Sequence, residues 1–312
     1  MKQKIATRDA YGEVLVELGK KNSSIVVLDA DLSKSTKTAD FKEVFPQRFF
    51  NMGVAEADMM GTAAGFAAAG LLPFASTFAV FAAGRAYDQV RNSIAYTGLN
   101  VKIVATHAGI TVGEDGSSHQ SVEDIAIMRV MPNMTVIVPA DGPETKKAVE
   151  AAVELNGPVY VRLGRMGVPV LFSEEEPFVI GKGKIIKDGS DITIIAIGIM
   201  VSIALEAAET LLQQGVKARV INLPTLKPLD EEIIIRAAQE TGGIITAEEH
   251  SIIGGLGGAV SEVTAENCPV PVKRVGVRDT FGESGSPELL LEKYGLTSKN
   301  IVKAAQELLN KR

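Results

Sequence analysis

Glu56 is the first residue whose position requires a chemical explanation. It lies in FFNMGVAEADMMG, residues 49–61, where a short apolar segment passes into a helix of small residues. Residues 59–84 carry no charged side chain, so the carboxylate adjoins a long apolar stretch. A buried carboxylate is costly unless it is protonated or paired. Glu56 is therefore either a functional acid or a first-turn acid stabilised by the helix dipole, a place that Asp58 could equally take.

A second group of reactive side chains lies in THAGITVGEDGSSHQ, residues 106–120, here called the histidine loop. It contains His107 and His119, two of the three histidines, together with Glu114 and Asp115. Three glycines in the loop allow backbone conformations that bring these side chains to one point. The spacing matches no compact zinc pattern, and a solvated loop without a role is another reading. Imidazole titrates near neutral pH, which favours acid–base or hydrogen-bonding work on a polyhydroxy substrate.

Alternating strand-length apolar runs and helical patterns predict an α/β fold with two open, mainly parallel-sheet domains. In the first domain we expect strands at residues 25–29, 72–77, 101–106, 135–139 and 159–163, and helices at 8–20, 55–69, 80–97, 121–130 and 143–155. Sites in such sheets form at the carboxyl ends of the strands. The segments that follow residues 25–29, 49–53, 101–106 and 159–163 should therefore converge on one edge of the first domain.

The helical pattern stops between about residues 164 and 190, where glycine, proline and acidic residues are frequent. We expect a first domain at residues 1–165, a linker with a hairpin at 166–190, and a second α/β domain at 191–312. The second domain contains the glycine cluster IIGGLGGAV, residues 252–260, preceded by His250. Its spacing departs from the dinucleotide-binding fingerprint, so tight helix packing at a subunit contact is the better interpretation.

Length and charge exclude several classes of protein. A chain of 312 residues favours two domains. A net charge of −6 argues against nucleic acid or an anionic membrane as the main partner. Residues 59–84 could cross a bilayer by length, but Pro73, the glycines and the scarcity of large aliphatic side chains argue against a membrane span. The single cysteine, Cys268, and the lack of a signal-peptide pattern predict a cytoplasmic protein without an internal disulfide.

Several segments together resemble the transketolase family. NMGVAEADMMGTAAGFAAAG, STFAVFAAGRAYDQVR and THAGITVGEDGSSHQSVEDIAIMRVMPNMTVIVPADG are similar to its pyrimidine-binding domain. TAEEHSIIGGLGGAVSEV and FGESGSPELLLEKYGLTSKNIV are similar to its C-terminal domain. The sequence contains no Gly-Asp-Gly motif of the kind found in the family's diphosphate-binding domain. The similar Glu114-Asp115-Gly116 belongs to the histidine loop. The chain therefore resembles the C-terminal subunit of a split transketolase.

The resemblance implies a thiamine diphosphate-dependent transfer of two-carbon units between sugar phosphates. The cofactor and its Mg²⁺ or Ca²⁺ ion would be bound largely by a separate N-terminal subunit, so the chain alone would be inactive and would hold no metal of its own. Homodimerisation through the small-residue helices would complete an α2β2 assembly.

Residue roles follow from the same resemblance. Glu56 matches the family glutamate that hydrogen-bonds N1′ of the aminopyrimidine, and His107, His119 and Asp115 match residues that contact substrate hydroxyls and assist proton transfer. Further matches are Phe78 and Phe81 beside the aminopyrimidine, Asp31 near the cofactor, and Arg8, Ser35 and Arg165 at the sugar phosphate.

Three other interpretations remain open. The β subunit of a 2-oxo acid dehydrogenase's decarboxylating component shares the architecture and the glutamate, but its loop usually lacks GEDG-x-x-HQ. A fragment of 1-deoxyxylulose-5-phosphate synthase would have a sequence similar to RAYDQV, residues 85–90. A non-catalytic thiamine-binding or regulatory subunit would not be expected to keep Glu56, both loop histidines and Asp115.

Overall fold

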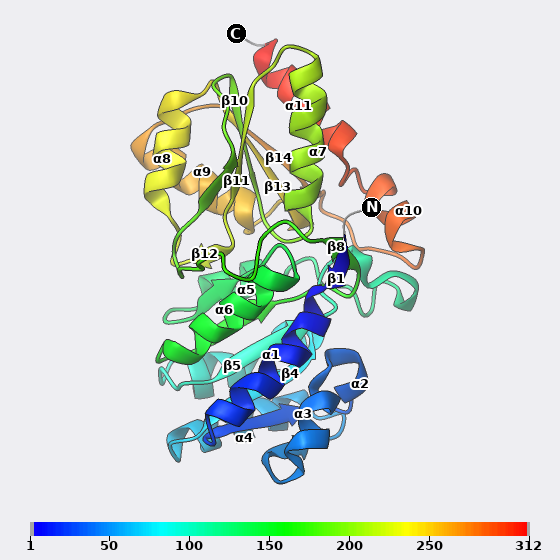
Figure 1. Ribbon diagram of the computed structural model, residues 1–312, viewed down its shortest axis with the longest axis vertical. Helices are drawn as coiled ribbons and strands as arrows, with labels where there is room; N and C mark the ends of the chain where they lie inside the picture. Colours follow the sequence, from blue (N-terminus) through cyan, green and yellow to red (C-terminus); the bar gives the residue numbers. More distant parts are fainter. Residues whose placement is uncertain (1–2, 311–312) are drawn as a thin grey trace.

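The computed structural model describes residues 3–310 and contains two α/β domains stacked along the long axis (Figure 1). The first domain forms the lower half in that view, and the second domain forms the upper half. The predicted architecture of two mainly parallel sheets is confirmed by the strand pairing of both domains.

The first sheet has seven strands in the order β12-β6-β7-β5-β4-β2-β3. Six of them run parallel, and their bounds are β2 (Ile25–Asp29), β3 (Phe49–Asn51), β4 (Leu72–Phe78), β5 (Lys102–Thr106), β6 (Thr135–Ile137) and β7 (Val159–Arg162). Every residue of the central strands is buried, as the continuous apolar runs predict for a sheet covered on both faces.

Helices cover both faces of this sheet (Figure 1). One face packs against α1 (Thr7–Lys21), α3 (Thr38–Val44) and α6 (Gly142–Glu154), and the other against α4 (Glu56–Ala68) and α5 (Asp124–Val130). In α1, the buried side chains Tyr11, Val14, Leu15 and Leu18 recur at helical spacing and form one apolar stripe. Shorter elements complete this half: α2 (Ser33–Thr36), η1 (Pro46–Arg48) and η4 (Ile110–Asp115).

The helix expected at residues 80–97 forms as two wide, π-helical segments, η2 (Phe81–Arg85) and η3 (Gln89–Ala95). Such turns are rare and occur frequently at functional sites. They change the direction of side chains relative to an α-helix. This change matters here because η2 begins at Phe81 and ends at Arg85, and both residues contribute to the site described below.

The second sheet has the order β14-β13-β10-β11-β9. Its parallel strands are β10 (Ile192–Ala196), β11 (Ala218–Asn222), β13 (Ile244–Ser251) and β14 (Val272–Val277). The helices of this half are α7 (Met200–Gln213), α8 (Glu231–Glu240), α9 (Leu256–Asn267), α10 (Pro287–Lys293) and α11 (Ser298–Leu309).

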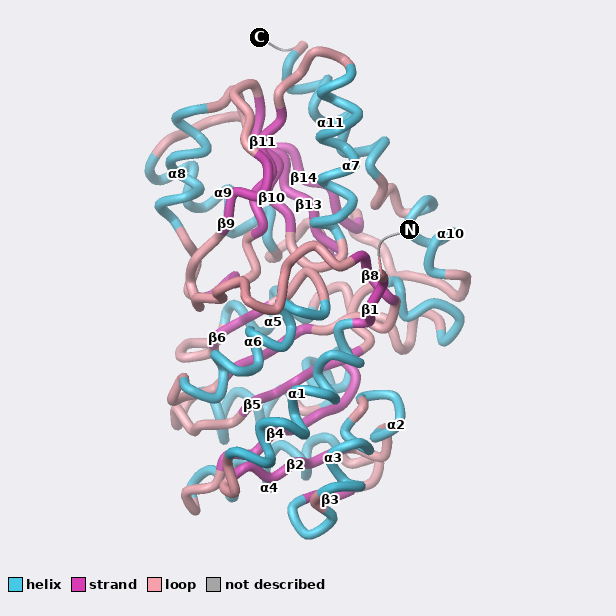
Figure 2. Tube along the Cα trace, in the orientation of Figure 1, coloured by secondary structure: helices cyan, strands magenta, loops and turns pink. Residues whose placement is uncertain are grey.

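The prediction of a hairpin within residues 166–190 is wrong. The segment contains β8 (Gly167–Pro169) and β9 (Lys184–Lys187), but these strands do not pair with each other. β8 pairs antiparallel with β1 (Lys4–Ala6) at the domain junction, and β9 joins the edge of the second sheet beside β11 (Figure 2). Distant strands supplied the backbone partners that a local hairpin would otherwise have provided.

The two domains are joined by more than the linker. β12 (Thr225–Lys227) belongs to the second half of the chain but pairs antiparallel with β6 in the first sheet. A buried ion pair lies at the junction: Arg162 Nε donates to Asp124 Oδ2 over 2.8 Å. Arg162 Nη2 also donates to the carbonyl of Glu249 in β13, over 3.0 Å. The first sheet is therefore completed and tied by residues of the second domain.

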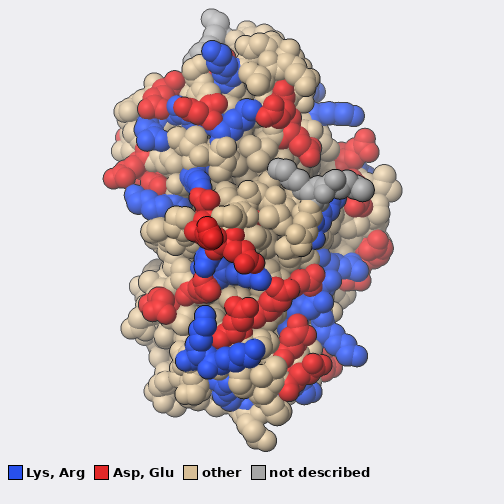
Figure 3. Space-filling model, viewed as in Figure 1, with Lys and Arg blue, Asp and Glu red and all other residues tan. Residues whose placement is uncertain are grey.

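The surface has a mixed charge on the face seen in Figure 3, where basic and acidic side chains are interspersed over both domains. Within residues 3–310, no helix combines the length and the apolar character that a bilayer span requires. The apolar stretch that could span by length alone is divided between α4, β4 and the start of η2.

We expect Arg162→Met to lower the free energy of unfolding by about 3–5 kcal/mol, because it leaves the Asp124 carboxylate buried without its counterion. Urea denaturation of the chain measures this loss. The matched control is Lys146→Met, which removes partly exposed ion pairs with Glu13 and Glu174 and should cost at most about 1 kcal/mol. Equal losses in the two variants would show that the buried pair does not stabilise the domain junction.

Candidate active site at the carboxyl edge of the first sheet

Glu56 begins α4, and its residue surface is only 3% exposed. Its Oε1 accepts a hydrogen bond from Arg85 Nη1 over 3.0 Å, so the buried carboxylate has a cationic partner. The side chain of Arg85 is 53% exposed, which places this ion pair at the protein surface rather than in the core. Asp58, by contrast, is exposed and forms none of the hydrogen bonds or ion pairs resolved in the structure. The two acids of this first turn therefore have different environments.

Four aromatic rings gather beside this ion pair. The rings of Phe78 and His107 are stacked, with centroids 3.8 Å apart and planes at 17°. Phe78 and Phe81 are also nearly parallel, with centroids 5.8 Å apart. His119 presents its edge to Phe81 at 5.5 Å, and the Arg85 guanidinium lies 4.0 Å from the centroid of Phe81. A continuous series of contacts thus connects Glu56, through Arg85 and Phe81, to both loop histidines.

His107 is fixed as a neutral imidazole. It follows β5 directly and has φ +55°, in the left-handed region. Its Nε2 lies 3.3 Å from Arg8 Nη1, which can only donate, so Nε2 is the acceptor and Nδ1 carries the proton toward Thr106 Oγ1, 2.9 Å away. Burial is the main cause that lowers the pKa of His107 to about 3, and the charges of Arg8, Arg165 and His119 add to it. His107 therefore offers a hydrogen-bond acceptor rather than a charge at neutral pH.

Two arginines border the ring cluster. Arg8 Nη1 also donates to the carbonyl of Ser35 over 3.1 Å, so the contact made by Ser35 runs through its backbone. Burial lowers the pKa of Arg8, with the nearby Asp9 opposing the shift. Arg165 donates to the Val112 carbonyl and lies 3.9 Å from Asp115 across an ion pair. Arg165 also lies 3.4 Å from Glu114, so each of the two arginines has an acidic neighbour where α1, the end of β7 and the histidine loop meet.

Asp31 is placed differently from the other predicted residues. It is exposed at the carboxyl end of β2, has φ +64°, and its carboxylate accepts from Asn51 Nδ2 over 2.9 Å. None of the contacts resolved for it within residues 3–310 reaches the aromatic rings. Its role toward a cofactor stays a prediction.

The histidine loop is not arranged as a metal site. Among residues 3–310, no group of three or more histidine, cysteine, aspartate or glutamate side chains is placed to hold a metal ion. Its three glycines all have positive φ: Gly109 at +81°, Gly113 at +85° and Gly116 at +78°. The loop thus uses the backbone freedom expected from the sequence to fold back on the rings.

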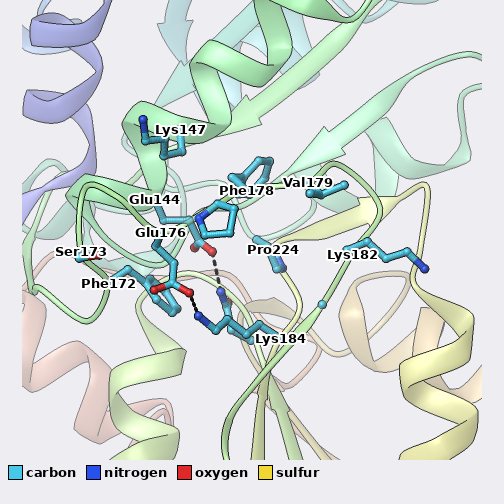
Figure 4. A pocket seen from close by; sticks show the side chains of 13 residues that line it. Glu144, Lys147, Phe172, Ser173, Glu176, Phe178, Val179, Lys182, Lys184 and Pro224 are labelled. Atoms are coloured by element: carbon cyan, nitrogen blue, oxygen red, sulfur yellow. Dashed lines mark hydrogen bonds and ion pairs between the residues drawn. The ribbon is translucent and has the colours of Figure 1, made fainter.

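A separate cavity of about 180 Å³ lies between the linker and the two domains (Figure 4). Glu144 and Asn222 lie on its wall, and Glu144 accepts from the Ala140 amide and from Asn222 Nδ2, both over 2.6 Å. Burial raises the pKa of Glu144 to about 7. The cavity shares no residue with the ring cluster, and its lysines point to acidic partners: Lys147 to Glu150, Lys182 to Glu232 and Lys184 to Glu176.

Residues 3–170 match the family model described as transketolase, pyrimidine binding domain, and residues 181–301 match transketolase, C-terminal domain. The chain belongs to the transketolase family. At the level of the family it is a thiamine diphosphate-dependent transferase.

Similar proteins of the same length are parts of divided transketolases. The chain is 53% identical over 307 residues to a putative transketolase C-terminal section of Methanocaldococcus jannaschii, with 97% of this chain and 96% of that protein covered. It is 48% identical over 305 residues to a 6-deoxy-6-sulfo-D-fructose transketolase subunit of Clostridium sp., with 98% and 95% covered. A solved structure described as a split gene transketolase, inactive beta4 tetramer, has a TM-score of 0.92 and 58% identity, covering 98% of this chain and 99% of that one.

The residues fit the aminopyrimidine half of thiamine diphosphate. Glu56 offers a buried carboxylate for a ring nitrogen, and Phe78 and Phe81 are aromatic rings of the same cluster, with Phe78 stacked on His107 and Phe81 beneath the Arg85 guanidinium. The sequence analysis did not assign Arg85 to the site. The sequence contained a signal, because a buried acid needs a partner and Arg85 is the first charged residue after the apolar stretch.

We expect the His107 ring in the folded chain to show no titration between about pH 5 and pH 8. NMR of the imidazole resonances, assigned with His107→Gln, measures this. Because the folded pKa lies below the ordinary value near 6.5, His107 contributes stability that is present above that pH and is lost as the pH falls toward the folded pKa. Arg8→Gln should raise the pKa of His107, since the arginine charge helps to lower it. A midpoint near 6.5 in the unmodified chain would contradict the buried neutral ring.

Proposed function

We propose that this chain supplies the pyrimidine-side half of a transketolase active site. In this proposal the assembled enzyme transfers a two-carbon ketol unit reversibly from a ketose phosphate to an aldose phosphate. The observation that carries the proposal is the buried Glu56 carboxylate, connected through Arg85 and Phe81 to the two loop histidines, of which His107 lies beside Arg8. This is the set of groups that binding of a heterocycle next to an anionic sugar requires.

Glu56 has the role of a hydrogen-bond partner for N1′ of the aminopyrimidine, with Phe78 and Phe81 fixing the plane of that ring. When bound, thiamine diphosphate supplies the electron sink that cleavage of a carbon–carbon bond next to a carbonyl requires. Protein groups orient the reactants and manage protons. Arg85 donates to Oε1 of Glu56, so Oε2 is the oxygen that we assign to the contact with N1′.

The substrate side of the proposal uses the loop and the arginines. His107 accepts a hydrogen bond from a sugar hydroxyl at Nε2, the atom that faces Arg8 in the structure. Asp115 is exposed and His119 is half-buried, so both can contact a second hydroxyl. Arg8 and Arg165, with Ser35 beside them, attract the anionic end of the sugar, because a guanidinium fork pairs with two oxygens of a phosphate.

A separate N-terminal subunit completes the site in this proposal, holding the diphosphate and its Mg²⁺ or Ca²⁺ ion. Two copies of each subunit form an α2β2 assembly. Support comes from the similarity to a split gene transketolase whose β4 tetramer is described as inactive, which fits a chain that needs its partner.

The donor sugar has a second candidate. The relative from Clostridium sp. is a 6-deoxy-6-sulfo-D-fructose transketolase subunit, and a sulfonate is an anion that the same arginines can pair with. The assay of function therefore compares a sugar phosphate with a sulfosugar as the donor substrate.

The function is tested by mixing the chain with a separately produced N-terminal transketolase subunit, thiamine diphosphate and Mg²⁺. We expect two-carbon transfer from xylulose 5-phosphate to ribose 5-phosphate, with no transfer when either subunit is omitted. 6-Deoxy-6-sulfofructose as donor identifies a sulfosugar enzyme. Decarboxylation of pyruvate instead would favour a 2-oxo acid dehydrogenase component or a deoxyxylulose phosphate synthase. No detectable turnover of any donor would favour a non-catalytic subunit.

We expect Glu56→Gln to lower kcat by about 10²–10⁴-fold, the range for loss of a group that manages a proton. Assembly with the partner, followed by analytical ultracentrifugation, should be unchanged. The matched control is Asp58→Asn, an exposed acid in the same helical turn, which should leave kcat within about twofold because exposed substitutions are usually near neutral. Turnover near the unmodified rate in Glu56→Gln would remove Glu56 from the catalytic role.

We expect His107→Ala to raise KM for phosphorylated sugars because the ring positions a substrate hydroxyl. Arg165→Ala should raise KM for the phosphorylated donor by about 10–100-fold, the loss expected for a hydrogen bond to a charged group. With an uncharged ketose donor, Arg165→Ala should change KM little, whereas His107→Ala should still raise it. An unchanged KM for the phosphorylated donor in either variant would count against the assigned contact.

A further inference from the structure

The histidine loop is held by the second domain as well as by its own strand. The Thr111 amide, near the start of the loop, donates to Glu249 Oε1 over 2.7 Å. Gln120, at the end of the loop, donates to the Glu283 carbonyl over 2.8 Å and to the Ile110 carbonyl over 3.1 Å. Both ends of the loop are thereby connected to β13 and to the segment before α10, which lies beside the loop in Figure 1.

The middle of the loop has a third connection. Ser284 Oγ donates to the Glu114 carbonyl over 2.7 Å, next to the predicted substrate residue Asp115. The backbone at Gly113 also approaches this segment closely, since a Cβ added there would lie 3.3 Å from the Gly285 carbonyl oxygen. The second domain therefore contacts the loop on both sides of Glu114 and Asp115, the two acidic residues of the loop.

Glu249 packs directly against the loop backbone. A Cβ added to Gly109, which has φ +81°, would clash with Glu249 Oε1. Arg162 Nη2 donates to the Glu249 carbonyl and to the Ser121 carbonyl, over 3.0 and 3.3 Å, and so fixes the strand and the loop end together. Any shift of the Glu249 side chain must move the loop.

Glu248, the neighbouring acid in β13, binds a different part of the structure. Glu248 accepts from the amides of Leu256 and Gly257, over 2.7 and 2.8 Å, in the first turn of α9. Successive side chains of a strand point to opposite faces, so Glu248 serves its own domain while Glu249 reaches the first domain. Both residues are buried, which makes Glu248 a matched control for Glu249.

We infer that Glu249, assisted by the Glu283–Ser284 segment, is a positioning residue through which the C-terminal domain sets the conformation of the histidine loop. The Thr111 contact fixes the backbone between His107 and Asp115, the two loop residues assigned to substrate. The effect on substrate rests on the proposed function. The effect on loop order does not, because it is a property of the chain alone.

The test uses three variants of the full chain. Glu249→Met removes the acceptor of the Thr111 amide and keeps a side chain of similar length. Glu249→Gln keeps an acceptor oxygen for that amide. Glu248→Met removes a buried carboxylate of the same strand without touching the loop. Hydrogen exchange of residues 106–120 is measured in the chain by itself, and kcat and KM are measured in the assembled enzyme.

In Glu249→Met we expect the Thr111 amide to exchange about 10–100-fold faster, the loss of one hydrogen bond to a charged group. KM for the sugar donor should rise more than kcat falls, because the loop places substrate contacts. Glu249→Gln should restore both values to within about threefold. Glu248→Met should lower the unfolding temperature while leaving loop exchange and KM unchanged.

Ser284→Ala gives a second measurement, because Ser284 is exposed and its loss does not endanger folding. It should speed amide exchange around Glu114 and Asp115, whereas Ser286→Ala, a helix cap without a side-chain hydrogen bond, should not.

Three results would overturn the inference: equal exchange in Glu249→Met and the unmodified chain, equal effects of Glu249→Met and Glu248→Met, or faster exchange with unchanged KM. If no donor is turned over by the unmodified assembly, the proposed function fails. The exchange result then still decides whether the second domain orders the loop.

Discussion

The structure depends on one electrostatic requirement: the carboxylate of Glu56 is buried and must be paired. The chain meets it with Arg85, whose guanidinium also covers Phe81. A carboxylate held in this way has a defined position next to the parallel rings of Phe78 and Phe81. Groups that are fixed in advance bind a ligand more tightly, because less conformational freedom is lost on binding. The wide π-helical turn at Phe81–Arg85 lets one short segment provide both the ring and the counterion.

Topology explains why the remaining residues meet this pair. The parallel strands β2, β4, β5 and β7 end on one edge of the sheet, so side chains far apart in the sequence converge there. The second domain then limits the freedom of the longest loop at that edge. Glu249 and Ser284 bind its backbone, while β12 and the Asp124–Arg162 pair bind the sheet beneath it. The two domains thus form one support for the site, although only the first carries the groups assigned to chemistry.

Much of this could be predicted from local sequence. Buried strands appear as continuous apolar runs, and the three loop glycines at positive φ match the flexibility expected from their spacing. Contacts between distant segments could not be predicted. The pairing of β12 with β6, the failure of a local hairpin at residues 166–190, and the reach of Glu249 to Thr111 depend on tertiary packing that no periodicity records. Asp31 is a further example: its position at a strand end could be predicted, but its hydrogen bond with Asn51 could not.

The central claim is most directly tested by a structure of this chain assembled with an N-terminal transketolase subunit and thiamine diphosphate. The account predicts a Glu56 carboxylate oxygen within hydrogen-bonding distance of N1′, about 2.6–3.2 Å. An aminopyrimidine bound elsewhere, with Glu56 outside that distance, would contradict it.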